Sequence, residues 1–424
     1  MRPELPPGPA LLPVAQTARW IVRPTQFMER NRREYGDVFT VRLGGVGRYV
    51  FVSDPVLIKQ IFTAGPGQLH AGESNWPLIP VLGEHGSLLL DGKEHLARRK
   101  IILPPFHGER LERYREMFAE VAREQIADWP RNEPFALLPK MQSITLELIM
   151  RVVFGEDEDP ARLKRLATAM TELAAAGQNR LGMIPWLRYD VGRWSPMGMF
   201  MAVRKRVDDV LYEEIARRRE RGGLDERHDV FSMLLQTDMT DEELRDELMT
   251  ILIAGHETTT TALAWAFERL LRHPGMYDRL RTDDRWAEAV ASETLRLRPP
   301  VPLVGRRVKE EFQLDGYTIP AGETLAPCIW LTHRRPEVYP DPYAFKPERF
   351  LDKPPETYTW LPFGGGTRRC VGAAFAQLEM TVVMRTIAEE VQLEPAEPEA
   401  EPVGRRAIVL APKRGSRVIV STGG

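Results

Sequence analysis

The sequence predicts a mainly helical α+β fold in which small β-sheets are gathered from distant parts of the chain. From about residue 91 to residue 271, apolar residues recur at three- and four-residue spacing, which is typical of helices. Alternating apolar and polar residues surround turn signals in 37–55, 312–330 and 407–420, which predicts short strands and hairpins. No internal repeat or long linker interrupts the 424 residues, so we expect one domain over residues 1–424.

The composition excludes several classes of protein. The chain has 58 basic and 60 acidic residues, and this balance argues against a nucleic-acid partner. Two cysteines, Cys328 and Cys370, permit at most one disulfide, so a disulfide-stapled secreted scaffold is excluded. The first 15 residues are proline-rich and are expected to lie extended, and prolines and Arg19 interrupt any signal peptide. Because no apolar run reaches about 18 residues, we expect a cytoplasmic protein without a transmembrane anchor.

The longest expected helix begins after Thr240, which forms a capping-box pattern with Glu243. Helical spacing continues to Arg272, and thirty-odd residues at 1.5 Å each give a helix of roughly 48 Å. In its middle the segment AGHETT, residues 254–259, places polar residues between apolar flanks. A polar solvent face is the simpler interpretation, but apolar residues on nearly all sides of the flanks favour a functional cavity.

The segment LPFGGGTRRCVG, residues 361–372, is called the cysteine loop. It places Cys370 between a glycine-rich turn and a helix expected from about residue 371. It lacks the Lys-Ser or Lys-Thr of a phosphate-binding loop, the further ligands of a zinc site, and a nearby base for a cysteine protease. A structural cysteine would not explain the glycines and arginines. A helix N-terminus stabilises a thiolate, the glycines allow close approach of a flat partner, and the arginines suit its carboxylates. Together they describe haem iron ligated by cysteine.

These residues carry a resemblance to a known family. Phe363, Gly366, Arg368, Cys370 and Gly372 fill F-x-x-G-x-R-x-C-x-G, which resembles the haem-binding loop of the cytochrome P-450 family. The resemblance implies the cytochrome P-450 fold, with a long central helix over haem b (iron protoporphyrin IX). It implies that Cys370 is the axial ligand of the iron, that Phe363 shields the sulfur and that Arg368 pairs with a propionate. It further places three small residues against the macrocycle: Gly364, Gly372 and Ala376. Cys328, in an apolar run, is interpreted as core.

The segment AGHETT resembles the family's oxygen-binding motif, [AG]-G-x-[DE]-T-[TS]. The resemblance assigns Thr258 to hydrogen-bonding bound dioxygen and Glu257 to relaying protons, as catalytic residues. Small Ala254 and Gly255 would leave room beside the haem. His256 occupies the variable position, and any role for it in proton transfer stays open.

Two further motifs resemble supporting sites of the family. Glu293 and Arg296, three apart on one helix face, would alone be a solvated pair, but with Arg349 they match a Glu–Arg–Arg network that braces the cysteine loop. His95 and Arg99 match an H-x-x-x-R pattern of propionate ligands, although the sequence alone suggests a solvated basic face. Family spacing favours Arg306 as another propionate partner, and a one-residue slip would substitute Arg307.

The resemblance implies a monooxygenase that inserts one atom of O2 into a lipophilic organic substrate, such as a fatty acid, terpenoid or steroid. No flavin or nicotinamide fingerprint is present, so electrons are expected from a ferredoxin or flavodoxin with an NAD(P)H-dependent reductase. Three basic residues are candidates for the surface that meets this donor: Arg98, Lys100 and Arg369. The alternatives are a peroxide-driven peroxygenase or haem-thiolate isomerase and, from another class, a non-catalytic haem sensor.

By family position, the substrate pocket is expected to use these residues: Trp76, Ala254, Thr258, Val301, Leu303 and Val304. The Met- and Trp-rich segment 181–200 is expected to form part of an access lid, with apolar packing as an equal alternative.

Overall fold

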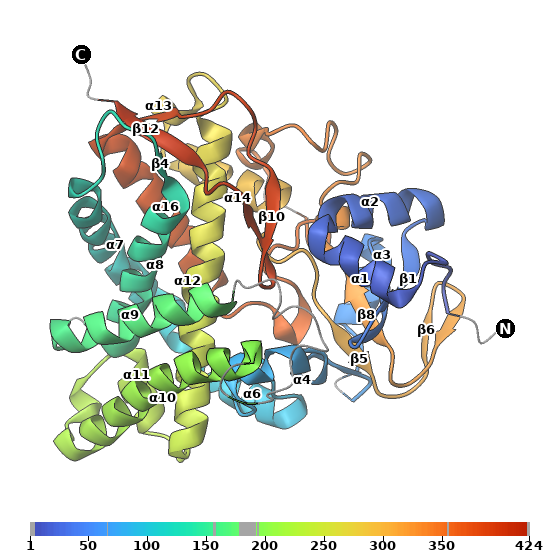
Figure 1. Cartoon of the computed structure of the whole chain (residues 1–424), viewed down its shortest axis with the longest axis horizontal. Coiled ribbons are helices and arrows are strands. Elements are labelled where there is room, and N and C mark those ends of the chain that lie inside the picture. The colour runs from blue at the N-terminus through green and yellow to red at the C-terminus, as the bar shows by residue number, and fades with distance from the viewer. Residues whose placement is uncertain are drawn as a thin grey trace.

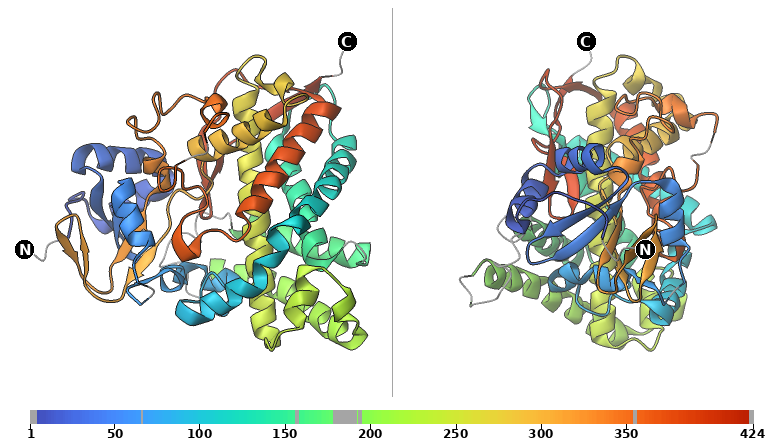
Figure 2. Two further views of the ribbon diagram at one scale, coloured as in Figure 1. Left: turned by 180° about the vertical axis from the view of Figure 1, so that it is seen from behind. Right: turned by 90° about the vertical axis from the view of Figure 1, so that its right-hand side faces the viewer.

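The computed structural model describes residues 5–65, 67–155, 158–177, 192, 195–353 and 356–421. Most of the helices gather on one side of the molecule, and most of the strands lie on the other together with the first three helices of the chain, which fall within residues 13–62, with the two chain ends far apart (Figure 1). The helical side is arranged around α12 (Asp241–Leu270), which runs through the middle of the fold in every view (Figures 1 and 2). Helices that pack on it include α8 (Leu137–Phe154), α10 (Pro196–Arg221), α14 (Asp284–Leu297) and α16 (Ala373–Glu390). Helix α7 (Glu109–Ala127) packs in turn on α8 and α16.

The start of α12 confirms the predicted capping box. Thr240 Oγ1 accepts a hydrogen bond from the Glu243 N–H at 3.3 Å, and Glu243 Oε2 accepts one from the Thr240 N–H at 2.9 Å. These reciprocal bonds satisfy donors that a helix N-terminus otherwise leaves free. The 30 residues that follow give a length of about 45 Å, which carries the segment 254–259 deep into the helical side.

In its described parts, the predicted helical section 91–271 is confirmed as mostly helical, and α12 is its last helix. The remaining described α-helices are α1 (Pro13–Val22), α2 (Pro24–Tyr35), α3 (Pro55–Phe62), α4 (Ala71–Ser74), α5 (Ile79–Leu82), α6 (Gly92–Ile102), α9 (Pro160–Gly177), α11 (Val230–Leu235), α13 (Met276–Arg279) and α15 (Ile329–Thr332). None of the helices in these described ranges combines the length and the apolar composition that crossing a bilayer requires.

The main sheet has five strands in the order β1-β2-β8-β5-β3. They are β1 (Val38–Leu43), β2 (Gly47–Val52), β8 (Thr324–Pro327), β5 (Arg306–Val308) and β3 (Leu69–His70). The predicted hairpin β1–β2 is confirmed, with Val38 opposite Val52. A parallel pairing of β2 with β8 brings segments about 270 residues apart together, as expected for sheets gathered from distant parts of the chain.

Two smaller features of the strand-rich side also follow from the sequence. Strands β6 (Phe312–Leu314) and β7 (Tyr317–Ile319) form a hairpin around Asp315 and Gly316, whose φ angles are +50° and +76°. The proline-rich start lies along β1, where the Thr40 N–H donates to Pro7 O at 2.9 Å. A side chain at Gly8 would overlap the Thr40 carbonyl, so only glycine fits there.

The predicted terminal hairpin over residues 407–420 is wrong. Strand β11 (Val409–Pro412) pairs with β10 (Val403–Arg406), whereas β12 (Arg417–Ser421) pairs with β9 (Gln392–Pro395) and β4 (Phe135–Ala136) in another sheet. The chain turns between them at Gly415 and Ser416, which have φ angles of +83° and +53°. Ser416 Oγ then donates to Ala264 O of α12 at 2.9 Å, and this long-range bond directs β12 away from β11.

Candidate functional site

The loop before Cys370 is shaped by its three glycines. Gly364 and Gly366 have φ angles of +67° and +65°, a region that side chains rarely adopt. A side chain at Gly365 would overlap the ring of Phe62 in α3, and one at Gly366 would overlap the Phe62 carbonyl. Two of the glycines therefore admit Phe62, which corrects the expectation that all three serve the approach of a flat ligand. The loop closes with a 2.9 Å hydrogen bond from the Cys370 N–H to Phe363 O.

Cys370 lies three residues before the first residue of α16, close to the expected position at a helix N-terminus. Cys370 is exposed to solvent by its accessible surface, although many protein atoms lie around its sulfur. Burial raises the pKa of the thiol, while the Gly372 N–H, Arg99 and Arg369 act in the opposite direction. Cys328 is fully buried near Met28, and burial raises its pKa to about 12, which confirms its interpretation as a core residue.

Three arginines and a histidine lie together beside this loop, and we call them the arginine cluster: Arg99, Arg306, Arg368 and His95. Burial lowers the pKa of Arg306 and of Arg368 to about 10, and each is further lowered by a neighbouring arginine. Burial, followed by repulsion from the three arginines, lowers the pKa of His95 to about 4, so its imidazole is neutral. The guanidinium groups donate to backbone carbonyls: Arg368 to Leu90 O (2.6 Å) and Leu88 O (3.0 Å), Arg306 to Gly305 O (2.8 Å), and Arg99 to Arg369 O (2.7 Å).

The arginine cluster has an excess of positive charge. Within the described part of the chain none of Arg99, Arg306 and Arg368 forms an ion pair, and Asp91 is the acid that acts on the latter two. Three guanidinium groups against one carboxylate leave a formal excess of two positive charges. Arg306 is buried and Arg99 and Arg368 are half-buried, and cations withdrawn from water in this way favour anionic partners, so the cluster fits a ligand that carries two carboxylates, as haem does.

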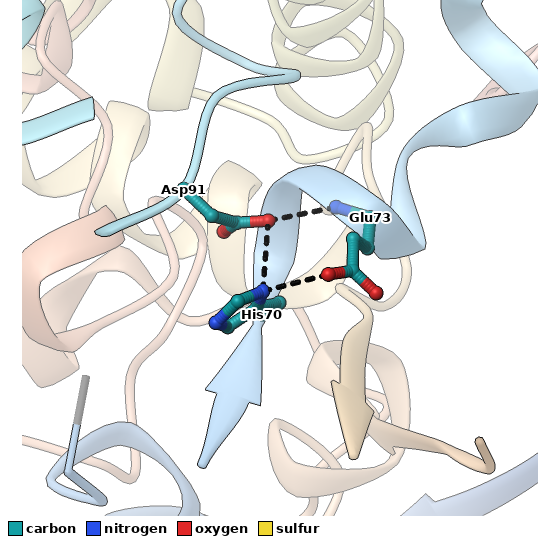
Figure 3. A group of neighbouring side chains, drawn as sticks. All are labelled: His70, Glu73 and Asp91. Atoms are coloured by element: carbon teal, nitrogen blue, oxygen red, sulfur yellow. Dashed lines mark hydrogen bonds and ion pairs between the residues drawn. The ribbon is translucent and has the colours of Figure 1, made fainter. Parts of the chain in front are cut away.

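The surroundings of Asp91 hold its carboxylate in place (Figure 3). It accepts hydrogen bonds from the backbone N–H groups of Gly72 and Glu73, both at 2.9 Å, and lies 3.7 Å from His70 Nδ1. His70 Nδ1 lies 2.8 Å from Glu73 Oε1, so a histidine and two carboxylates of metal-ligand type come together. Because Lys309 Nζ already supplies Glu73 with a cation at 2.6 Å, we interpret the group as a hydrogen-bonded brace for Asp91.

The middle of α12 is accessible on one face only. Ala254 is exposed and Thr258, one turn further on, is half-buried, whereas Leu252 and Thr260 are buried. Thr258 Oγ1 donates to Ala254 O at 2.8 Å. At Gly255 a Cβ would lie 2.9 Å from Ile149 Cδ1 of α8, so the missing side chain makes room for α8, and Ala254 accounts for the open face.

Glu257 is held by a residue that the sequence did not reveal. Its Oε1 lies 2.7 Å from Nε of Arg406 in β10, and Arg406 in turn donates to Gln142 Oε1 at 3.0 Å. No local pattern marks Arg406, because it is the second of two adjacent arginines in a four-residue strand. His256 is buried, with Nδ1 2.6 Å from Leu252 O, and burial lowers its pKa.

The structure brings Glu293, Arg296 and Arg349 together. Glu293 and Arg296 are fully buried and form two contacts of 2.6 and 2.7 Å, and Arg349 Nε lies 3.6 Å from Glu293 Oε1. His333, which no pattern in the sequence marks, connects this network to the cysteine loop. Its Nδ1 donates to Arg296 O at 3.1 Å and its Nε2 accepts the Leu361 N–H at 2.6 Å.

Of the remaining charged residues, some lie where the sequence predicts and one does not. The expectation that Arg98 lies on a basic surface is wrong, because it is buried and paired with Glu243 (2.9 Å) and Glu247 (3.4 Å). Lys100 and Arg369 are exposed. Arg306 lies in the cluster, and Arg307, the next residue in β5, points to the other face of the sheet.

The predicted substrate residues also differ in their surroundings. Trp76 is 42% exposed, and Val301 is half-buried after α14. Leu303 and Val304 pack against the cores of the strand-rich side. In the segment expected to form a lid, residues 181–191 and 193–194 lie outside the described residues.

Comparison with known proteins places these features in one family. A model of the cytochrome P450 family matches residues 6–418. Cytochrome P450 135B1 of Mycobacterium tuberculosis is 39% identical over 438 residues, covering 98% of this chain and 91% of the relative. Cytochrome P450 137 of the same organism is 38% identical over 405 residues, covering 92% and 84%.

Solved structures agree with this result. Cyanobacterial CYP120A1 with bound retinoic acid superposes with a TM-score of 0.85 at 24% identity, covering 99% of each chain. CYP175A1 from Thermus thermophilus superposes with a TM-score of 0.76 at 26% identity, covering 92% of this chain and 93% of that one.

Proposed function

Because the chain belongs to the cytochrome P450 family, we propose that Cys370 is the axial thiolate of its haem and that Ala254 and Thr258 face the oxygen and the substrate. Membership makes the chain a haem-thiolate monooxygenase with iron protoporphyrin IX, an oxidoreductase with the cytochrome P450 fold. The observation that carries the residue assignment is an accessible cysteine before a helix N-terminus, beside arginines with two uncompensated charges.

The arginine cluster is the proposed propionate site. Arg99, Arg306 and Arg368 supply the charge, and neutral His95 supplies a hydrogen bond. Arg306 takes this role in preference to Arg307 because it faces the cluster. Asp91 leaves the cluster with a charge equal and opposite to that of two propionates.

The haem, when bound, supplies the redox chemistry that activates dioxygen and transfers one oxygen atom to the substrate. The chain's own residues manage protons. The Thr258 hydroxyl donates a hydrogen bond to Ala254 O, so the lone pairs of its oxygen remain free to accept a hydrogen bond at the open face of α12. Glu257, one residue earlier, is the proposed proton relay, and Arg406 anchors one of its oxygens.

The electrons are proposed to come from a separate ferredoxin or flavodoxin that an NAD(P)H-dependent reductase recharges. Exposed Lys100 and Arg369 support this, because Arg369 adjoins Cys370 and acidic donors associate through complementary charge. The substrate is proposed to be a lipophilic organic molecule. Apolar Trp76, Val301 and Ala254, which are accessible or half-buried, are suited to contact it.

The spectrum of the reduced, carbon-monoxide-bound protein tests the ligand. We expect the far red-shifted Soret band of thiolate ligation, its loss in Cys370→His, and no change in Cys328→Ser. A wild-type band in Cys370→His would contradict the assignment.

Turnover separates the alternatives. Product that requires NADPH, ferredoxin, reductase and O2 supports the monooxygenase, whereas product formed only with added peroxide supports a peroxygenase. Turnover without net oxidation indicates an isomerase, and no turnover of any compound that shifts the iron spin state indicates a sensor. A screen of fatty acids, terpenoids and steroids by spin-state shift identifies the substrate class.

A further inference from the structure

His256 is a buried histidine directly before Glu257 on α12. Its ring is 2% exposed, and Nδ1 lies 2.6 Å from the carbonyl oxygen of Leu252. A carbonyl oxygen only accepts hydrogen bonds, so Nδ1 carries the proton. Burial lowers the pKa of the imidazole, which is therefore neutral. Nε2 then has a lone pair and no proton, and it must accept a hydrogen bond to be satisfied.

Glu257 presents a second acceptor to the same place. Its Oε2 lies 3.8 Å from His256 Nε2, too far for a direct hydrogen bond, and neither atom has a hydrogen-bond partner among the described residues. Its other oxygen, Oε1, lies 2.7 Å from Arg406 Nε, so the carboxylate is held in an ion pair. Two buried acceptors without a donor are costly, because each loses its water without a replacement.

Arg406 supplies the complementary atom. Although its Nε is close to Glu257 Oε1, the N–H is not aimed at that oxygen, and Nε also has no aligned partner within the described ranges. The group therefore contains two buried acceptors and one buried donor. A water molecule has the matching complement, since it donates two hydrogen bonds and accepts others, and buried waters typically make about three.

We propose that His256 Nε2 and Glu257 Oε2 bind one water molecule, which donates a hydrogen to each and accepts one from Arg406. The inference rests on the proposed role of Glu257 as proton relay and deepens it. His256 is a positioning residue that never touches the haem or the substrate. It fixes the water that keeps Oε2 turned away from Arg406. Without His256, both carboxylate oxygens of Glu257 can bind the guanidinium group of Arg406, and Oε2 is then no longer free to relay a proton.

The water site is tested by crystallography of the haem-loaded protein at a resolution that shows ordered water. We expect a water within about 3.2 Å of both Nε2 and Oε2. An empty space between well-ordered side chains, or a histidine ring turned so that Nε2 leaves Glu257, would overturn the proposal.

Nitrogen NMR tests the tautomer independently, in the diamagnetic, reduced, carbon-monoxide-bound protein with labelled histidine. The eight histidines are few enough for the His256 signal to be assigned from its loss in His256→Gln. We expect a protonated Nδ1 and an unprotonated Nε2. The opposite tautomer, or a doubly protonated ring, would refute the proposal.

Three variants separate positioning from packing. His256→Gln keeps an acceptor where Nε2 lies, and His256→Leu removes it. His273→Leu is the matched control, because His273 Nδ1 lies 2.7 Å from Arg269 O, the same bond to the residue four positions earlier, far along the chain from Glu257. Each variant is first checked for its carbon-monoxide spectrum and thermal midpoint.

The readout is the ratio of hydrogen peroxide released to product formed, measured with NADPH, ferredoxin, its reductase and the compound giving the largest spin-state shift. A positioned proton donor raises a reaction rate about 10²–10⁴-fold, and a residue that only positions the donor contributes a smaller factor. We therefore expect peroxide release to rise about tenfold in His256→Leu. His256→Gln should restore coupling, and His273→Leu should match the wild type. If Glu257→Gln uncouples the enzyme and His256→Leu does not, the water-positioning role is wrong. If Glu257→Gln has no effect, the proposed relay itself fails.

Discussion

The buried pair Glu293–Arg296 offers the sharpest test of what holds the cysteine loop. Both side chains are fully buried, and Glu293 also accepts the Lys346 N–H at 2.8 Å. The change Glu293→Gln keeps the shape and removes the charge. Arg296 then remains as a buried cation without a carboxylate partner, and breaking one side of such a pair costs about 3–5 kcal/mol.

Thermal unfolding followed by circular dichroism measures this cost. An unfolding entropy of about 2.1 cal/mol/K per residue gives about 0.9 kcal/mol/K for 424 residues, so we expect the midpoint to fall by about 3–6 °C. Glu112→Gln is the matched control, because Glu112 and Arg115 form the same E-x-x-R pair on α7 with side chains 65% and 50% exposed. An exposed pair is worth about 0–1 kcal/mol, or about 1 °C at most. Equal midpoints for the two variants would refute the reasoning.

Three further predictions follow from buried groups. Burial lowers the pKa of His333 well below 6.5, so the unfolded chain binds a proton that the folded one lacks. This histidine alone should lower the free energy of unfolding by about 1.4 kcal/mol per pH unit below pH 6.5. Because burial also lowers the pKa of His95 and His256, the test is the difference in slope between the wild type and His333→Gln, which does not titrate at this position, measured from urea midpoints. Identical slopes would contradict the assignment. Burial raises the pKa of Glu379 well above its usual range, so infrared spectra at neutral pH should contain a protonated-carboxyl band that disappears in Glu379→Gln. The free energy of unfolding of this variant should differ from that of the wild type by less than about 1 kcal/mol, and an ionised Glu379 would contradict the prediction. Arg306→Gln should speed haem transfer to apomyoglobin about tenfold or more, because a charged hydrogen bond is worth about 1.5–3 kcal/mol. Arg307→Gln should leave the transfer rate unchanged, and the reverse result would assign the propionate contact to Arg307.

Features that depend on neighbours in sequence were predictable. The capping box at Thr240, the β1–β2 hairpin and the Asp315–Gly316 turn are all specified within a few residues, and the structure confirms them. The motif around Cys370 is similarly compact, which is why the family and its cofactor could be inferred from the sequence.

Features that depend on long-range contacts were not predictable. Ser416 bonds to α12 and so directs β12 away from the expected hairpin. Arg98 looks like any surface arginine until Glu243 and Glu247 of α12 are brought beside it. Arg406 reaches Glu257 from β10, about 150 residues further along the chain. No local pattern of charge or hydropathy encodes such contacts.

His333 shows how the separate motifs act as one unit. Glu293 holds Arg296, whose Nη1 donates to His333 O at 2.9 Å, and His333 accepts the N–H of Leu361, the first residue of the cysteine loop. Every link is buried, so a displacement of Arg296 must be transmitted to His333 and then to Leu361. A network that only added stability would leave the haem site unchanged until the protein unfolds. We therefore expect the folded Glu293→Gln protein, at temperatures below its unfolding midpoint, to show a weakened thiolate band with carbon monoxide. The Glu112→Gln protein should show the wild-type band. An unaltered band in Glu293→Gln would mean that the network stabilises the fold without setting the position of Cys370.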